Sequence, residues 1–142
     1  MLTRVESPLA PELEDIVHRI IGCALEVHKS LGAGFLESIY HKALRIELRH
    51  QQLKFKSEQP VVIKYRDEMV HSHRIDLIVE DQVIVEVKAV ERLDRIHQSQ
   101  VISYLKATDK QVGLLINFNT DWLKGSIRRI GSSPRVTKIQ VI

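Results

Sequence analysis

The stretch Arg74-Ile-Asp-Leu-Ile-Val-Glu-Asp-Gln-Val-Ile-Val-Glu-Val-Lys-Ala89 decides the fold. It is rich in β-branched residues and predicts two strands, 70–79 and 83–90, joined by a polar corner at 80–82. Both strands carry apolar residues on both faces, which is typical of central strands that are covered on both sides. Three charged residues nevertheless lie in the apolar parts of these strands, 75–79 and 83–90: Asp76, Glu86 and Lys88.

The register of the hairpin decides whether these three charges meet. If the corner has three residues, Asp76 lies opposite Glu86, and both carboxylates share one face with Lys88. A two-residue turn would put Asp76 opposite Val87 and place Glu86 on the far face. The apolar pattern does not choose between the two registers, but the three-residue corner gathers the charges into one cluster.

Such a cluster requires a counter-charge. Two carboxylates about 4 Å apart repel by roughly 4 kcal/mol at an effective dielectric constant of about 20, and the single lysine cannot neutralise both. A divalent cation would resolve the conflict, and oxygen ligands without a nearby cysteine favour Mg²⁺, Mn²⁺ or Ca²⁺ over zinc. The alternative is an edge strand whose charged side chains face water.

The composition is that of an ordinary globular domain. The chain has 142 residues, of which 44% are hydrophobic and 27% are charged, and we expect one domain spanning residues 1–142. No apolar run approaches the ~20 residues that a membrane-spanning helix needs, and the acidic N-terminal segment lacks the apolar core of a secretion signal. We therefore expect a cytoplasmic protein with no membrane partner. The single cysteine, Cys23, lies in an apolar helical stretch, which predicts a core residue rather than a nucleophile.

The net charge of +3 is unevenly distributed. Residues 120–142 form a basic C-terminal extension with a net charge of +4, so residues 1–119 sum to −1. This extension is compatible with contacts to phosphate groups and equally compatible with a solvated surface. Charge alone therefore does not predict a nucleic-acid partner.

Hydrophobic periodicity predicts the remaining elements. Helices are expected at 11–30, 36–51 and 94–108, and further strands at 55–65, 111–118 and 135–142. Pro60 predicts an edge position or a bulge for the strand that contains it. The helix 94–108 connects strands 83–90 and 111–118, which predicts a right-handed crossover between a parallel pair. The predicted fold class is therefore α/β, with a mixed central sheet flanked by helices on both faces.

Two of the predicted helices carry polar residues that could belong to a site. Glu37 lies at the edge of an apolar arc, so its carboxylate either points into a cleft or faces the positive end of its own helix dipole. On helix 94–108, three polar residues line up at three- and four-residue spacing: His97, Gln100 and Tyr104. Such a stripe is either a solvated helix face or one wall of a site.

Several short motifs resemble those of known nucleases. Asp76 and Glu86-Val-Lys88, with nine residues between them, resemble the signature of the PD-(D/E)XK nuclease superfamily. Gly34-Phe-Leu-Glu-Ser-Ile-Tyr40 resembles the Gly-x-x-Glu-x-x-Tyr signature of the small bacterial GxxExxY family, which is similar to this superfamily. Gln100-Val-Ile-Ser-Tyr104 resembles the Gln-x-x-x-Tyr element of the branch typified by the RecB nuclease domain. Leu114-Leu-Ile-Asn-Phe118 resembles the Leu-Leu-x-Asn-Phe strand of the GxxExxY family.

The resemblance covers about residues 12–130 and implies a restriction-endonuclease-like core. Ile75 stands where the name of the superfamily has proline, and isoleucine suits a central strand better. In such a core, Asp76 and Glu86 would bind one or two Mg²⁺ or Mn²⁺ ions together with the backbone carbonyl of Val87. Glu37 would complete the ligand shell, directly or through water.

The resemblance also implies roles for three further residues. Lys88 would orient the attacking water or stabilise the transition state electrostatically, and Glu37, Asp76 and Glu86 would complete the catalytic group. Gln100 and Tyr104 would border the pocket and contact the substrate. The implied reaction is hydrolysis of phosphodiester bonds in DNA, with RNA as the alternative substrate, and a homodimer stays open.

Two other classes of function are compatible with the sequence. The chain could be a non-hydrolytic module that binds nucleic acid or protein and retains the nuclease fold. It could also be a zinc protein, because His71-x-His73 places two histidines on one strand face. Alternation puts that face opposite to Asp76, and no further spacing of ligands supports zinc.

Overall fold

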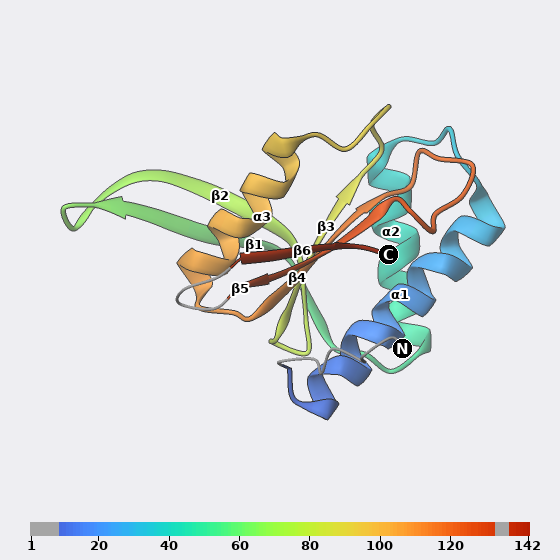
Figure 1. The fold of residues 1–142 in the computed structure, drawn as a ribbon, viewed down its shortest axis with the longest axis horizontal. Coiled ribbons are helices and arrows are strands. Elements are labelled where there is room, and N and C mark those ends of the chain that lie inside the picture. Colours follow the sequence, from blue (N-terminus) through green and yellow to red (C-terminus); the bar gives the residue numbers. More distant parts are fainter. Residues whose placement is uncertain (1–8, 133–136) are drawn as a thin grey trace, which may run out of the picture.

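The computed structural model describes residues 9–132 and 137–142. Three helices and six strands follow one another in the order α1 (Pro11–Leu31), α2 (Glu37–His50), β1 (Phe55–Tyr65), β2 (Glu68–Val79), β3 (Val83–Lys88), α3 (Arg95–Thr108), β4 (Val112–Asn117), β5 (Ile127–Ser132) and β6 (Thr137–Val141). The strands form one six-stranded sheet in sequence order (Figure 1). Strands β3 and β4 are parallel and all other neighbours are antiparallel, so the predicted mixed α/β class is confirmed.

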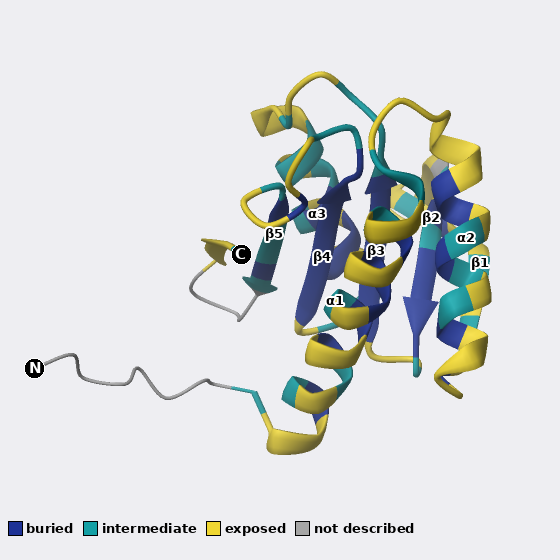
Figure 2. Ribbon diagram, turned by 90° about the vertical axis from the view of Figure 1, so that its right-hand side faces the viewer, coloured by how far each residue is buried: buried dark blue, intermediate teal, exposed yellow. Residues whose placement is uncertain are grey.

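Helices cover both faces of the sheet, with α1 and α2 on one face and α3 on the other (Figure 2). The core under α1 and α2 takes alternate residues of β3, namely Val83, Val85 and Val87. The core under α3 takes Ile84 from the same strand. Because both faces are buried, β3 is a continuous apolar run interrupted only by its charged residues.

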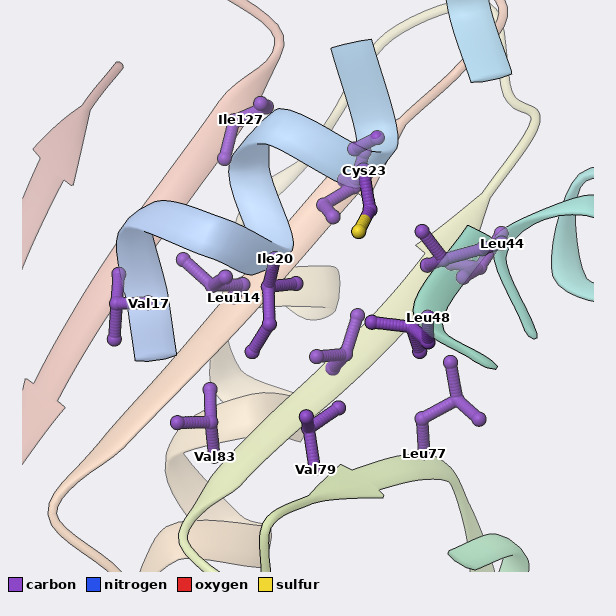
Figure 3. Packing of buried hydrophobic residues seen from close by; sticks show 14 of the residues in the cluster. Val17, Ile20, Cys23, Leu44, Leu48, Leu77, Val79, Val83, Leu114 and Ile127 are labelled. Carbon is purple, nitrogen blue, oxygen red and sulfur yellow. The ribbon is translucent and has the colours of Figure 1, made fainter. Parts of the chain in front are cut away.

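The larger core lies between the two N-terminal helices and the sheet (Figure 3). In this view Val17, Ile20 and Cys23 of α1 lie above the strands, and Leu44 and Leu48 of α2 lie beside them. Each fully buried aliphatic side chain of this kind contributes about 1.5–3 kcal/mol. This packing fixes α2, and with it the N-terminal end of that helix, relative to β2 and β3.

The three-residue register of the central hairpin is confirmed. Val79 pairs with Val83 and Ile78 pairs with Ile84, so Asp76 falls opposite Glu86. The corner contains no glycine, although two of its residues adopt left-handed backbone angles: Glu80 with φ +50° and Asp81 with φ +58°. The Gln82 amide donates a hydrogen bond to the Val79 carbonyl across this corner (3.0 Å).

Strands β1 and β2 form a long hairpin that projects from the body of the sheet (Figure 1). They pair from Phe55↔Val79 to Tyr65↔Glu68, whereas β2 and β3 pair only from Leu77↔Val85 to Val79↔Val83. Beyond Leu77, β2 therefore pairs with β1 alone, although Val61 and Ile75 still pack against α3. Strand β1 is at the edge of the sheet, as Pro60 predicts.

Strand β5 was not predicted. Its sequence contains two arginines, and its two buried residues, Ile127 and Ile130, pack in different cores, so neither alternation nor an apolar run marks it. Arg129 donates a hydrogen bond to the Glu14 carboxylate of α1 (Nη1–Oε2 2.8 Å), which ties the strand to the first helix. Strand β6 confirms the predicted last strand from residue 137 onward, and residues 135 and 136 lie outside the described part of the chain.

Cys23 is a core residue, as predicted. Its side chain is 2% exposed, and burial raises the pKa of the thiol to about 11. The thiolate, which is the nucleophilic form, is therefore strongly disfavoured.

Candidate active site

Asp76 and Glu86 meet where β2 and β3 separate. Beyond the Leu77↔Val85 pair, carboxylates replace backbone carbonyls as the acceptors between the two strands. The Asp76 amide donates to Oε1 of Glu86 (3.0 Å), and the Val87 amide donates to Oδ2 of Asp76 (2.8 Å). Each carboxylate thus spans the gap to the opposite strand, and the two charges predicted to cluster do so.

Glu86 is buried in this position and resists ionisation. It is 2% exposed, and its pKa is raised to about 8, first by burial and then by the Asp76 carboxylate. The hydrogen bond from the Asp76 amide and the charge of Lys88 act in the opposite direction without cancelling the rise. The charge of Lys88 thus does not compensate for the burial and mutual repulsion of the two carboxylates. Their oxygen atoms are the ligands that a divalent cation such as Mg²⁺ or Mn²⁺ prefers.

The carbonyl of Val87 faces the same gap. The Lys88 carbonyl accepts a hydrogen bond from the Phe118 amide on the β4 side (2.9 Å). Successive carbonyls of a strand point to opposite sides, so the Val87 carbonyl points toward β2, as does the Val87 amide that binds Asp76. The three atoms predicted as metal ligands therefore border one opening between β2 and β3.

Lys88 is the last residue of β3 and is half-buried. Its ammonium group lowers the pKa of both Glu86 and Glu37, so it lies near both carboxylates. Within the described part of the chain it forms an ion pair with neither of them. The ammonium group of Lys88 is therefore near both carboxylates without forming a direct ion pair with either.

Glu37 is the first residue of α2, and contacts of the following residues fix the start of this helix. Tyr40, one turn later, donates a hydrogen bond to the Gly32 carbonyl (2.5 Å) and accepts one from the Phe35 amide (3.2 Å). The Tyr40 ring also stacks on Phe118, with ring centroids 4.8 Å apart. These contacts fix the α1–α2 loop against the end of β4 and thereby set the start of α2.

The environment of Glu37 favours the cleft orientation over a simple helix-dipole role. Desolvation raises the pKa of Glu37, Lys88 lowers it, and Asp76 raises it. The carboxylate therefore lies in the electrostatic field of the strand charges, although its residue is exposed.

Helix α3 contributes a second wall. Tyr104 is 2% exposed, and its pKa is raised by burial and then by the charge of Glu86, with the Gln100 hydrogen bond opposing. Gln100 donates that bond from Nε2 to the Tyr104 hydroxyl (3.0 Å). Gln100 and Tyr104 are thus brought to the carboxylate pair. His97 is used differently, because its Nδ1 accepts a hydrogen bond from the Asp94 amide at the start of α3 (3.0 Å).

Asn117 holds the loop that follows Lys88. It is 4% exposed at the end of β4, its Oδ1 accepts the Val90 amide (3.0 Å), and its Nδ2 donates to the Val90 carbonyl (2.9 Å). An asparagine inside an apolar strand is a sequence signal for such a contact, because a buried amide requires hydrogen-bond partners.

Two residues that the sequence did not predict lie beside Asp76. His41, one turn after Glu37 on α2, is 8% exposed, and its Nε2 lies 3.5 Å from Oε1 of Glu58 on β1 and 3.3 Å from the Asp76 carbonyl oxygen. One ligand atom each from His41, Glu58 and Asp76 lies within 4.8 Å of the others, which is close enough to hold a metal ion. Glu58 reaches this position because the β1–β2 ladder is interrupted there. The sequence of β1 contains no signal that predicts this interruption.

His71 and His73 share one face of β2, as predicted, but the prediction that this face is opposite to Asp76 was wrong. The rings of His71 and His73 contact each other with centroids 4.3 Å apart, and His73 also lies 5.9 Å from the Tyr104 ring. Alternation fails across Asp76, since Ile75 and Ile78 both pack in the core under α3. Among the described residues, no third His, Cys, Asp or Glu joins this pair to form a metal-binding group, so the zinc hypothesis has no geometric support.

A mixed sheet that carries an Asp on one strand and Glu-x-Lys on the next, beside helices on both faces, has the architecture of a nuclease core. The family model of the PD-(D/E)XK nuclease superfamily matches residues 14–130. The chain belongs to this superfamily. Nucleases of this superfamily typically depend on divalent metal ions and act on nucleic acid. No curated protein and no solved structure matches the chain. The described helices include none that is both long and apolar enough to cross a membrane.

Proposed function

We propose that the chain is a metal-dependent nuclease of the GxxExxY type that hydrolyses phosphodiester bonds of DNA, as one catalytic domain spanning residues 1–142. The observation that carries this proposal is the carboxylate pair between β2 and β3, where Asp76 and Glu86 each bind the amide of the opposite strand. Two acidic side chains in a buried gap have no structural advantage over neutral ones, because their mutual repulsion costs stability. A cation site accounts for their presence.

In this proposal Asp76, Glu86 and the carbonyl of Val87 hold Mg²⁺ or Mn²⁺, and Glu37 joins the ligands directly or through water. The bound ion would lower the pKa of a water molecule and neutralise charge on the scissile phosphate. The buried position of Glu86 supports this assignment, because a carboxylate that is costly to ionise alone gains most from a nearby cation.

Lys88 is proposed as the residue that orients the attacking water or stabilises negative charge in the transition state. It lies near two carboxylates without an ion pair to either, so its ammonium group can contact a phosphate oxygen. Gln100 and Tyr104 are proposed to position the substrate on the α3 side of the opening, since their side chains form one hydrogen-bonded unit next to Glu86.

Single-turnover cleavage of labelled single-stranded, double-stranded and branched DNA at saturating Mn²⁺ tests the proposal. Lys88→Met should lower the rate by about 10²–10³, the usual loss for a preorganised electrostatic contact, and should leave Mn²⁺ binding measured by calorimetry unchanged. The matched control is Lys106→Met, which removes an exposed lysine of α3. Glu86→Ala should lose both Mg²⁺ binding and cleavage.

Two results would contradict the proposal. Equal cleavage by the wild type and Lys88→Met would refute the catalytic role of the lysine. Binding of DNA without cleavage by the wild type, with any of the three substrates, would instead favour a non-hydrolytic binding module that retains the fold.

A further inference from the structure

A second group of potential metal ligands lies next to the carboxylate pair, where α2 and β1 meet Asp76 of β2. It consists of His41, Glu58 and Asp76, which come from α2, β1 and β2. His41 is more than nine-tenths buried, and its Nε2 is directed at both the Glu58 carboxylate and the Asp76 carbonyl. Neither His41 nor Glu58 takes part in the site proposed for DNA hydrolysis.

The backbone of β1 is distorted where it supplies Glu58. The β1–β2 ladder runs through Ser57↔Leu77 and Gln59↔Ile75 but leaves out the pair of Glu58 and Asp76 between them. Glu58 has φ +52°, a left-handed angle that a non-glycine residue adopts at a cost of about 1–3 kcal/mol. The distortion places the Glu58 carboxylate against His41, and such local strain is typical of binding sites.

The distances suit a bound ion. Ligand atoms about 2.1 Å from an octahedral cation are about 3 Å apart when adjacent and about 4.2 Å apart when opposite. Nε2 of His41 lies 3.5 Å from Oε1 of Glu58, and all three ligand atoms lie within 4.8 Å of one another. The His41–Glu58 distance lies between the two octahedral values, and the half-exposed Glu58 side chain has room to adjust to an ion.

The ligand types select among ions. An imidazole nitrogen with two carboxylates suits Mn²⁺, Zn²⁺ and other transition metals, whereas Mg²⁺ and Ca²⁺ prefer oxygen ligands alone. The carboxylate pair of Asp76 and Glu86 offers oxygen only. Asp76 belongs to both groups, so two different ions would share one aspartate.

We propose that His41, Glu58 and Asp76 form a separate site for a divalent transition-metal ion, distinct from the Asp76–Glu86 site and selective for Mn²⁺ and Zn²⁺ over Mg²⁺. The site does not require that the chain cleaves DNA. Its occupation neutralises the Glu58 and Asp76 carboxylates, both of which raise the pKa of the nearby Glu37.

Pulsed electron paramagnetic resonance of Mn²⁺ tests the site without any activity measurement. The full chain loaded with Mn²⁺ should show coupling to a directly bound imidazole ¹⁴N. This coupling should disappear in His41→Gln and persist in the control His73→Gln, which alters a histidine outside the group.

Titration calorimetry gives a second readout that does not depend on a buried substitution. Glu58→Gln changes a half-exposed side chain and should weaken Mn²⁺ and Zn²⁺ binding at this site tenfold or more, with Mg²⁺ binding unchanged. The control Glu68→Gln alters an exposed glutamate of the same hairpin and should change neither. Glu86→Gln should weaken Mg²⁺ binding and retain the ¹⁴N coupling.

Three results would overturn the proposal. The first is the absence of ¹⁴N coupling in the wild type or its persistence in His41→Gln. The second is unchanged Mn²⁺ and Zn²⁺ affinity in Glu58→Gln. The third is loss of the ¹⁴N coupling in Glu86→Gln, which would show one shared site rather than two. Failure of DNA cleavage would affect none of these readouts.

Discussion

Glu86→Gln should make the metal-free chain more stable at neutral and alkaline pH. The substitution removes the buried charge, and the new side chain keeps an oxygen that can accept the Asp76 amide. Burial and the neighbouring Asp76 carboxylate raise the pKa of Glu86 to about 8 from the ordinary glutamate value of 4.5. The folded chain therefore binds a proton that the unfolded chain has released between these two values.

The sign of the pH dependence follows from proton linkage. Stability falls with rising pH wherever the folded state binds more protons than the unfolded state. The free energy of unfolding of the wild type should thus decrease as the pH rises from about 4.5 to about 8 and then level off. Because one pKa unit corresponds to about 1.4 kcal/mol, ionised Glu86 costs about 3 kcal/mol at pH 7 and about 5 kcal/mol above pH 8, before structural relaxation reduces both values.

Urea unfolding in EDTA at pH 5, 6.5 and 8 measures this effect. We expect Glu86→Gln to match the wild type at pH 5 and to exceed it by about 2–4 kcal/mol at pH 8, which raises the melting temperature by about 10 °C. The control Glu68→Gln, an exposed glutamate of the same strand, should follow the wild type at every pH. A Glu86→Gln chain that keeps the wild-type pH slope, or that is less stable at pH 8, would refute the reasoning.

Two further predictions concern the cation and the C-terminal strands. Millimolar Mg²⁺ or Mn²⁺ should raise the melting temperature of the wild type, because both ions bind the folded chain. Asp76→Asn should remove most of this rise without destabilising the metal-free chain. A wild-type melting temperature that neither ion changes would count against both metal sites. Arg129→Met should lower the stability by about 1–3 kcal/mol, because it removes the charged hydrogen bonds between β5 and the partly buried Glu14 carboxylate of α1. Arg128→Met, next to it, should cost less than half as much by urea unfolding. Equal losses would show that the Glu14 contact contributes nothing.

Much of the fold could be predicted from the sequence, because the buried strands and amphipathic helices have clear periods. The register of the central hairpin could not be predicted from apolar residues, since β2 and β3 are apolar on both faces. The charged residues indicated the three-residue corner, because only that register brings Asp76 and Glu86 together. The corner itself gave no signal, as Glu80 and Asp81 adopt left-handed angles that usually indicate glycine or asparagine.

The parts that could not be predicted depend on contacts between distant elements. Polar and apolar residues do not alternate regularly along strand β5, because Arg129 forms an ion pair with Glu14 of α1 instead of facing solvent. His41 and Glu58 are 17 positions apart in the chain, and they meet only through a contact between α2 and the irregular part of β1. The failure of alternation at Asp76, which brings His73 to Tyr104, has the same origin in the irregular β1–β2 ladder.

The separation of β2 and β3 at Asp76 and Glu86 also has a mechanical consequence. The hairpin of β1 and β2 leaves the sheet at this point, and the segment from Glu68 to Ile75 pairs with β1 alone. These eight strand residues are about 26 Å long. The hairpin therefore extends far from its base, where the Asp76 and Glu86 side chains connect β2 to β3. A rotation of about 5° at this base would move the turn between β1 and β2 by about 2 Å over that length. We expect the orientation of the distal turn to change with the proton or cation that the two carboxylates bind.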